Sequence, residues 1–556
     1  MTNDQKVATL LIGGLIFRII IAILLYPGFD EAYYFLYTLN LDLSYFDHPP
    51  LVALITGFGC WLTGEVSQFT IRLGTLILHT GSLFLLYLTG ARLFSPSAGI
   101  FALAIASLVP IFQIGFGVLT LPDSPLIFFW TASLYCASWE FFPNKQEKDR
   151  PKRYQPSYRL AILSLLVGLA CLGKYHGFIL GVGLIGFCLT RSRYRSALYS
   201  PWTLLGLALF CLAISPILIW NSQHEWVSFR FQSRRGIPSG GYNFLDFFVT
   251  FLSGIGYLFP TLGLPLWWVS LKTFFRNMSA KLPRSKFKGT GNGERGIVFA
   301  WASEGTASVK QSFSDREILI LWVSLPLILG FTWLGGYKQI LPTWATPGFW
   351  GATVLLGQAV TAWKIAHPRW IRRWLWGTGI TLSSLLLFAL LHVTTGTLQK
   401  PSQYALFGGF VPPEDDPSIQ IFDVQQLRHG FATSPVLLPA LQNSSFVFTN
   451  RYYLAGQIGM ALAPLASTPI TTFDRDLRGF AFWSKPDEWI GKDALYVTNN
   501  LFVQDQKFLD RYNLYFQSIE KIGTVPIKRG GAVIDTFHIY QAKNLLKPYP
   551  RPYGSK

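Results

Sequence analysis

Apolar stretches of roughly 20 residues recur along the first 400 positions of this 556-residue chain. Each stretch is long enough to cross a hydrocarbon core of about 30 Å as a helix. Half of the residues are hydrophobic and 14% are charged, a balance that a soluble core of this size does not need. The sequence therefore predicts a polytopic α-helical membrane protein.

We expect about eleven membrane spans, by the rule that a span needs about 20 apolar residues. They lie near residues 7–27, 70–92, 97–117, 121–142, 158–174, 176–190, 201–220, 246–272, 316–335, 341–363 and 374–397. The short pair 158–174 and 176–190 is also compatible with one broken helix, which would reverse the orientation of every later loop.

The positions of Lys and Arg predict which loops face the cytoplasm, because basic loops stay on that side. Four basic segments fall on one side of the eleven-span scheme: 143–159, 190–200, 272–316 and 363–373. The first loop on the other side, 28–69, has no Lys or Arg. We therefore expect a cell (inner) membrane protein with a cytoplasmic N-terminus. The net charge of +18 comes largely from basic loops, so we expect no nucleic-acid partner.

The last part of the chain, 400–556, reads as a separate extracytoplasmic domain. Segments 444–450, 494–500 and 531–542 have the pattern of strands, and 451–463 has that of an amphipathic helix. This alternation predicts a small α/β domain with a partly parallel sheet. The transmembrane domain would then be 1–399, with 277–314 as a cytoplasmic linker. We find no catalytic triad or ligand spacing in the C-terminal domain.

Cysteine and glycine patterns give little evidence for a cofactor. The five cysteines form no CxxC pair, so we expect neither a disulfide nor a zinc site. The segment "GVGLIG" (181–186) matches GxGxxG, but it lies inside an apolar run, where small residues favour close helix packing. No cofactor is required. A divalent cation beside paired acids is compatible with the pattern, although no spacing demands one.

The first outer loop carries the most informative residues, in "FDEAYYFLYTLNLDLSYFDHPPL" (29–51). Asp30 and Glu31 follow the first span, and Asp47 and His48 follow about four helical turns later. The residues between them have helical apolar spacing, which predicts a helix along the membrane surface. Loops at membrane interfaces are often simply polar. Against that interpretation, the loop has no Lys or Arg to neutralise carboxylates that are costly near low dielectric.

Other outer segments add acids and cations. "LPDSPL" places Asp123 at the mouth of a span, where it is either a site residue or a helix cap. "GKYHGFIL" places Lys174 and His176 between two apolar runs, where the lysine either snorkels or meets an anion. The same outer face holds Tyr337, Lys338, Arg230, Arg234 and Arg235. Together these groups predict an interface-level site that holds a lipid phosphate and removes a proton.

In chain order, "DE" (30–31), "YFDHPPL", "LPDSPL", "GKYHGFIL" and "GYKQILPTW" resemble the family 39-like branch of the integral-membrane glycosyltransferases. That branch includes the protein O-mannosyltransferases and the bacterial aminoarabinose transferases that modify lipid A. The resemblance covers roughly residues 1–400 and implies a GT-C-like fold of the bacterial type. It also implies an inverting transfer of a sugar from a polyprenyl-phosphate carrier to a cell-envelope acceptor, which is a lipid, a glycan or a protein.

The resemblance also implies roles for individual residues. Asp30 matches the catalytic acid of the family, Glu31 its neighbour, and Asp123 a second acid. The substrate-binding candidates are Asp47, His48, Lys174, His176, Tyr337, Lys338, Arg230 and Arg234. The aminoarabinose branch usually has an acid, a Lys and two prolines at the position of Asp47, His48 and the prolines that follow. His48 thus replaces a lysine, and a histidine makes a weaker permanent contact with a phosphate.

Two rival hypotheses come from other functional classes. A secondary transporter usually shows paired repeats and ion sites at mid-membrane, whereas the ionisable residues here gather on one face. A non-catalytic assembly or flippase-associated protein would need no catalytic acid. Transfer of a labelled sugar separates the enzyme from both.

Overall fold

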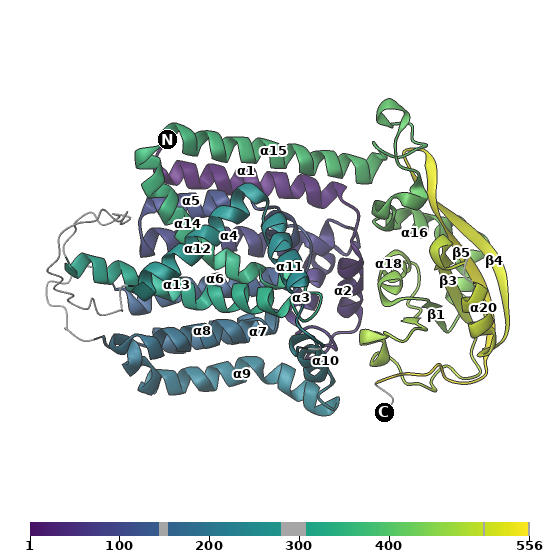
Figure 1. The fold of residues 1–556 in the computed structure, drawn as a ribbon. Coiled ribbons are helices and arrows are strands. Elements are labelled where there is room, and N and C mark those ends of the chain that lie inside the picture. Colours follow the sequence, from purple (N-terminus) through teal and green to yellow (C-terminus); the bar gives the residue numbers. More distant parts are fainter. Residues whose placement is uncertain (144–153, 239, 280–306, 504–505, 554–556) are drawn as a thin grey trace.

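The computed structural model describes residues 1–143, 154–238, 240–279, 307–503 and 506–553. Most of the predicted linker 277–314 lies outside the described residues. The N-terminal part of the chain forms a bundle of long helices, and the C-terminal part forms a smaller domain at one end of it (Figure 1).

The helices of the bundle follow the predicted apolar segments. Those that fall on the predicted spans are α1 (Asn3–Leu24), α4 (Leu73–Leu93), α5 (Pro96–Ala106), α6 (Asp123–Phe141), α7 (Arg159–Gly173), α8 (Gly177–Thr190), α9 (Pro201–Gln223), α11 (Phe244–Tyr257), α12 (Pro260–Ser279), α13 (Ala307–Leu334), α14 (Thr346–Ala366) and α15 (Pro368–Thr395). The other elements of the bundle are α2 (Phe29–Leu39), α3 (Leu51–Thr63), α10 (Val227–Gly236), η1 (Thr70–Arg72), η2 (Ile111–Phe116), η3 (Ser192–Tyr199) and η4 (Pro342–Trp344).

Each of the eleven predicted spans coincides with a helix or a pair of helices. By length and composition, five helices among the described residues could cross a membrane, or six if one bent pair counts as a span. The number eleven therefore stays a prediction. The span predicted at 246–272 is wrong as a single helix, because α11 and α12 form the bent pair, at 115°. Segment 158–190 is two helices, α7 and α8, separated at Lys174.

Close packing of α8 against α13 confirms the structural interpretation of "GVGLIG". A Cβ atom added at Gly183 would lie 2.5 Å from the Trp322 carbonyl oxygen. One added at Gly186 would lie 2.5 Å from the Trp322 ring. Side chains at these positions would force the helices apart, so this segment packs helices and does not cradle a nucleotide.

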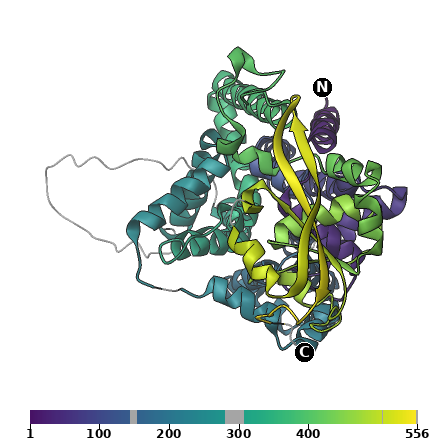
Figure 2. The same cartoon turned by 90° about the vertical axis from the view of Figure 1, so that its right-hand side faces the viewer.

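The C-terminal domain has the predicted partly parallel sheet. Its strands are β1 (Phe446–Thr449), β2 (Ile470–Thr472), β3 (Ala494–Asn499), β4 (Phe516–Arg529) and β5 (Ala532–Leu545), in the order β2-β1-β3-β5-β4. β1 pairs in parallel with β2 and β3, and β5 is antiparallel to β3 and β4. Seen from the C-terminal side, the long β4–β5 hairpin crosses in front of the bundle end (Figure 2). The sequence analysis missed β2 and β4.

Helices cover the side of this sheet that faces the bundle (Figure 1). They are α16 (Val424–Thr433), α17 (Leu437–Asn443) and α18 (Tyr452–Leu462). The other helical elements of the domain are η5 (Leu406–Gly408), η6 (Pro413–Asp415), η7 (Pro417–Gln420), η8 (Arg478–Ala481), α19 (Asn500–Val503) and α20 (Gln506–Asn513). The domain boundary at 399/400 stays a prediction.

The helix predicted at the membrane surface, α2, is covered on its outer side by α18. A Cβ atom at Gly456 would lie 2.6 Å from the Tyr33 backbone nitrogen, so the backbones of the two helices approach each other closely. Residues 31–38 of α2 are all buried. The position of this helix along the membrane surface stays a prediction, and the structure adds a partner helix more than 400 residues away in the sequence. This arrangement places Asp30 and Glu31, the first acidic residues of the outer loop, between the bundle and the C-terminal domain.

Candidate functional site

A cavity of ≈ 460 Å³ opens where the bundle meets the C-terminal domain. Its walls come from α2 and the loop after it, η2, the start of α6, the break between α7 and α8, α10, η4, and the C-terminal domain. Its charged lining side chains are Asp30, Asp123, Lys174, Arg235 and Arg478, and we call it the charged cavity. It brings together six residues named from the sequence: Asp30, His48, Asp123, Lys174, His176 and Arg235.

Asp30 lies in the first turn of α2, where its side chain is exposed to the charged cavity and is surrounded by protein groups that desolvate it. Within the described part of the chain, its carboxylate has no hydrogen-bond or ion-pair partner. Burial raises the pKa of Asp30 above its ordinary value, and the Arg478 guanidinium opposes that rise in part. A free carboxylate with an increased proton affinity is suited to general-base chemistry.

Glu31 faces away from the charged cavity and is only 1% exposed. It makes two hydrogen bonds with Arg72, of 2.7 and 2.8 Å, and accepts another from the backbone N–H of Thr120 at 3.0 Å. Arg72 also donates to the carbonyl oxygens of Ala22 and Tyr26 near the end of α1. Glu31 thus ties α2 to α1 and does not reach the cavity that holds Asp30.

Asp47 is fully buried behind the cavity wall. Arg478 Nη1 lies 3.2 Å from its carboxylate, and the hydroxyls of Tyr33 and Tyr37 donate to it. Burial raises the pKa of Asp47, whereas the Arg478 charge and the Tyr37 hydrogen bond lower it. The expectation that no cation neutralises the outer-loop acids is wrong, because Arg72 and Arg478 arrive from distant sequence.

Two histidines line the cavity. Burial lowers the pKa of His48 to about 3, so its imidazole is neutral at pH 7 and makes no permanent ionic contact. His48 Nδ1 and His176 Nε2 are buried and have no hydrogen-bond partner among the described residues. Both rings are thus available to a bound molecule as neutral hydrogen-bonding groups.

Lys174 and Asp123 form a buried pair in the cavity wall. Lys174 Nζ lies 2.9 and 2.8 Å from the two oxygens of Asp123. Lys174 stands at the break between α7 and α8, where its extended backbone ends α7. The helix-cap interpretation of Asp123 is wrong, because Pro122 is the N-cap residue of α6. The lysine does not snorkel either, since it is 8% exposed and paired.

The four remaining candidates do not line the charged cavity. Lys338 Nζ donates to the carbonyl oxygens of Arg234 and Ile237 and so caps the C-terminal end of α10. Tyr337 packs against Tyr242. Arg230 is exposed and lies 3.7 Å from Glu225. The arginine of this helix that lines the cavity is Arg235.

Sequence reasoning missed the contribution of the C-terminal domain. Arg478 and Tyr452 both line the charged cavity, and the Arg478 guanidinium stacks 3.8 Å from the centre of the Tyr452 ring. Arg478 lies 431 residues from Asp47, so no local pattern could pair them. The only sequence signal is the dense run of charges in "DRDLR" (474–478).

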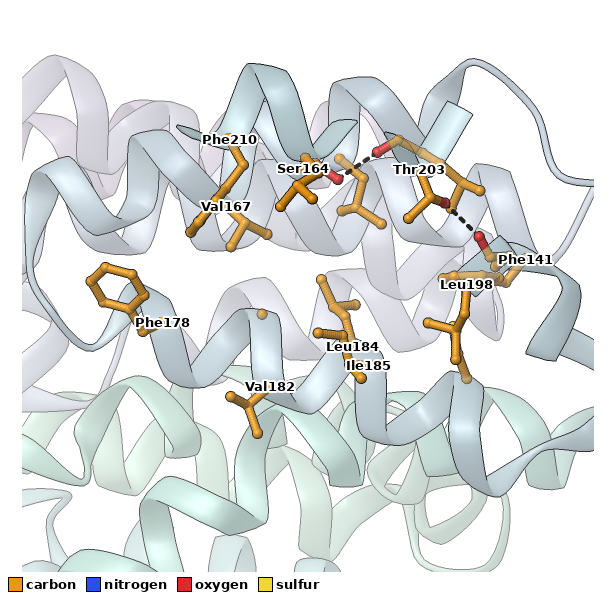
Figure 3. A pocket seen from close by; sticks show the side chains of 16 residues that line it. Phe141, Ser164, Val167, Phe178, Val182, Leu184, Ile185, Leu198, Thr203 and Phe210 are labelled. Atoms are coloured by element: carbon orange, nitrogen blue, oxygen red, sulfur yellow. Dashed lines mark hydrogen bonds between the residues drawn. The ribbon is translucent and has the colours of Figure 1, made fainter. Parts of the chain in front are cut away.

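A second cavity, of ≈ 350 Å³, lies between α7, α8 and α9 (Figure 3). Its lining is almost wholly apolar, and the hydroxyls of Ser164 and Thr203 donate to backbone carbonyl oxygens. It offers no charge to a phosphate, so we do not assign chemistry to it. Among the described residues, no three His, Cys, Asp or Glu side chains gather as potential metal ligands.

Comparisons with known proteins agree with this architecture. The family described as dolichyl-phosphate-mannose-protein mannosyltransferase matches residues 47–220. The lipid A galacturonosyltransferase RgtD of Rhizobium johnstonii is 24% identical over 391 residues, which is 68% of each chain. The crystal structure of ArnT from Cupriavidus metallidurans in the apo state has a TM-score of 0.57 at 12% identity, covering 96% of this chain and 98% of that one. ArnT bound to undecaprenyl phosphate has a TM-score of 0.53 at 12% identity, covering 96% and 97%. Both structural likenesses include the C-terminal domain.

Proposed function

We infer that this chain, a membrane glycosyltransferase with the GT-C fold, moves a sugar from a polyprenyl-phosphate carrier to a lipid acceptor of the cell envelope. The resemblance seen in the motifs is confirmed at the level of the fold and the enzyme class. The carrier is supported by the ArnT structure with undecaprenyl phosphate, and a lipid A acceptor by the galacturonosyltransferase. Nothing in these likenesses supports the transporter alternative.

The observation that carries the proposal is the unpaired Asp30 carboxylate in a cavity that also holds cations. Asp30 accepts the proton of the acceptor hydroxyl as its oxygen attacks the anomeric carbon. A new carbon–oxygen bond forms while the bond from the anomeric carbon to the phosphate oxygen breaks. The electron pair leaves with the phosphate, and attack from the opposite side inverts the anomeric centre.

Lys174 is our candidate for stabilising the departing phosphate, because it is a lining cation at the break between two bundle helices, α7 and α8. Its partner Asp123 holds the Lys174 ammonium group in place, and the phosphate then forms a second contact with the same ammonium group. For Glu31 we replace the catalytic role with a positioning role, since its buried bonds to Arg72 fix the first turn of α2.

Incubation of the purified full-length protein with undecaprenyl-phosphate-linked sugars and lipid A tests the proposal. We expect the mass of lipid A to increase by one sugar residue, with release of undecaprenyl phosphate. A panel of donors identifies the sugar. Uptake of the sugar into proteoliposomes without any transfer would contradict the proposal and favour a transporter.

The pH dependence of transfer provides a separate prediction. Because burial raises the pKa of Asp30, its carboxylate becomes protonated at a higher pH than an ordinary aspartate does. A protonated Asp30 cannot act as a base, so kcat/KM should fall as the pH drops through this raised pKa. The same acidic limb measured in the residual activity of Asp30→Asn would assign it to another group.

We propose that the charged cavity opens on the outer face of the cytoplasmic membrane, as the basic loops predict. Glu65 lies in the first outer loop and Arg193 in a predicted cytoplasmic loop, and both are exposed. In a background in which the exposed Cys211 is Ser, a membrane-impermeant maleimide should label Glu65→Cys in intact cells. Arg193→Cys should react only after permeabilisation. Labelling of both from outside would contradict this orientation.

A further inference from the structure

Arg478 is anchored on three sides but keeps part of its guanidinium free. Nη1 contacts Asp47 at 3.2 Å, Nε contacts Asp476 at 3.3 Å, and the plane stacks on Tyr452. Among the described residues, Nη2 has no hydrogen-bond partner. The side chain is 13% exposed, and it lines the charged cavity.

The backbone fixes the direction of this side chain. Arg478 has φ of +46°, a left-handed conformation that is uncommon for arginine and often occurs at functional sites. Its backbone N–H donates to Tyr553 Oη at 2.7 Å, and the next N–H, of Gly479, donates to Tyr33 Oη at 2.9 Å. The strained conformation is thus held from both domains, and the free donors are pre-organised.

A second arginine lines the cavity. Arg235 also lines it, with its guanidinium 4.2 Å from the centre of the Phe231 ring and no carboxylate partner within the part of the chain that the structure describes. Asp47 and Asp476 both pair with Arg478, and Asp47 also accepts hydrogen bonds from two tyrosines. The Nη2 group of Arg478 and the guanidinium of Arg235 remain as donors suited to an oxyanion.

The two sides of the cavity differ in origin. Lys174 belongs to the membrane bundle, whereas Arg478 belongs to the domain appended at its end (Figure 1). With the carrier phosphate at Lys174, as proposed above, the leaving group lies on the bundle side of the cavity. Because an inverting displacement places the attacking hydroxyl opposite the leaving phosphate, the acceptor then lies on the side of Arg478.

We propose that Arg478, stacked on Tyr452, binds a phosphate group of the acceptor, so that the C-terminal domain supplies the acceptor subsite. The proposal rests on the transferase function inferred above and adds the residue that recognises the anionic group of the acceptor. A planar guanidinium with free donors recognises phosphate in this way.

The test compares two acceptors, phosphorylated lipid A and the same lipid A after removal of its phosphates by phosphatase, with purified full-length enzyme. Arg478→Gln should raise KM for phosphorylated lipid A by about tenfold or more, since a hydrogen bond to a charged group is lost. KM for the polyprenyl-phosphate sugar should stay within about twofold, as should KM for dephosphorylated lipid A. Arg478→Lys keeps the positive charge but not the planar guanidinium. Its KM for phosphorylated lipid A should lie between the values of the wild type and Arg478→Gln.

Arg451→Gln is the matched control, because Arg451 also pairs with an aspartate of this domain, Asp474, but does not line the cavity. Its KM values should not change. The proposal would be overturned if Arg478→Gln raised KM equally for the two acceptors. It would also be overturned if the variant raised KM for the polyprenyl-phosphate sugar instead. If the wild type transfers no sugar at all, the proposed function fails. Native mass spectrometry of lipid A bound to wild type and Arg478→Gln then decides the subsite independently.

Discussion

Asp30→Asn is expected to reduce the rate of sugar transfer about 10²- to 10⁴-fold, the usual contribution of a general base, while the protein still inserts and folds. The Asp30 carboxylate has no partner among the described residues, so the amide disturbs no hydrogen bond or ion pair. Asparagine has nearly the same shape but cannot accept the hydroxyl proton. The loss should therefore appear in kcat, measured as sugar released from the carrier by purified enzyme, with little change in either KM.

Glu65→Gln is a suitable control for this experiment, because Glu65 is an exposed acid of the same outer loop and lies outside the charged cavity. It should transfer sugar at the wild-type rate. Asp30→Glu retains a carboxylate in a shifted position and should recover part of the activity. Normal turnover by folded Asp30→Asn would remove Asp30 from the role of base.

Local sequence patterns were sufficient to predict the helical bundle and several site residues. Long apolar runs become helices in either a membrane or a bundle, because both environments require the backbone to satisfy its own hydrogen bonds. Asp30, Asp123 and Lys174 each follow the end of such a run, and the ends of neighbouring helices meet at one end of the bundle. Proximity to the cavity could therefore be predicted without knowing the packing.

Pairing between distant charges could not be predicted in this way. The absence of Lys and Arg from the first outer loop suggested unneutralised acids, yet Arg72 lies 41 residues from Glu31 and Arg478 lies 431 residues from Asp47. Which acid stays free is decided by the direction of each side chain from α2. Asp30 and Glu31 are adjacent in sequence and point to different surroundings, one to a cavity and one to an arginine.

The buried Arg72–Glu31 pair leads to the prediction with the largest effect on stability. Both side chains are at most 1% exposed, and Arg72 also holds carbonyl oxygens at the end of α1. Arg72→Met would leave the Glu31 charge buried without a partner, which costs about 3–5 kcal/mol in comparable pairs. We expect a large loss of folded protein in the membrane and a lower midpoint of thermal unfolding in detergent.

The double variant Arg72→Met/Glu31→Gln separates the cost of the unpaired charge from the loss of the other Arg72 contacts. Removing both charges should recover part of the lost stability, because a neutral amide at position 31 can still accept the N–H of Thr120. The partial recovery should be accompanied by measurable transfer activity, since Asp30 is unchanged and Glu31 only positions α2. If Glu31 were itself the base, the double variant would fold and show no transfer, and the assignment of roles between these two neighbouring acids would have to be reversed.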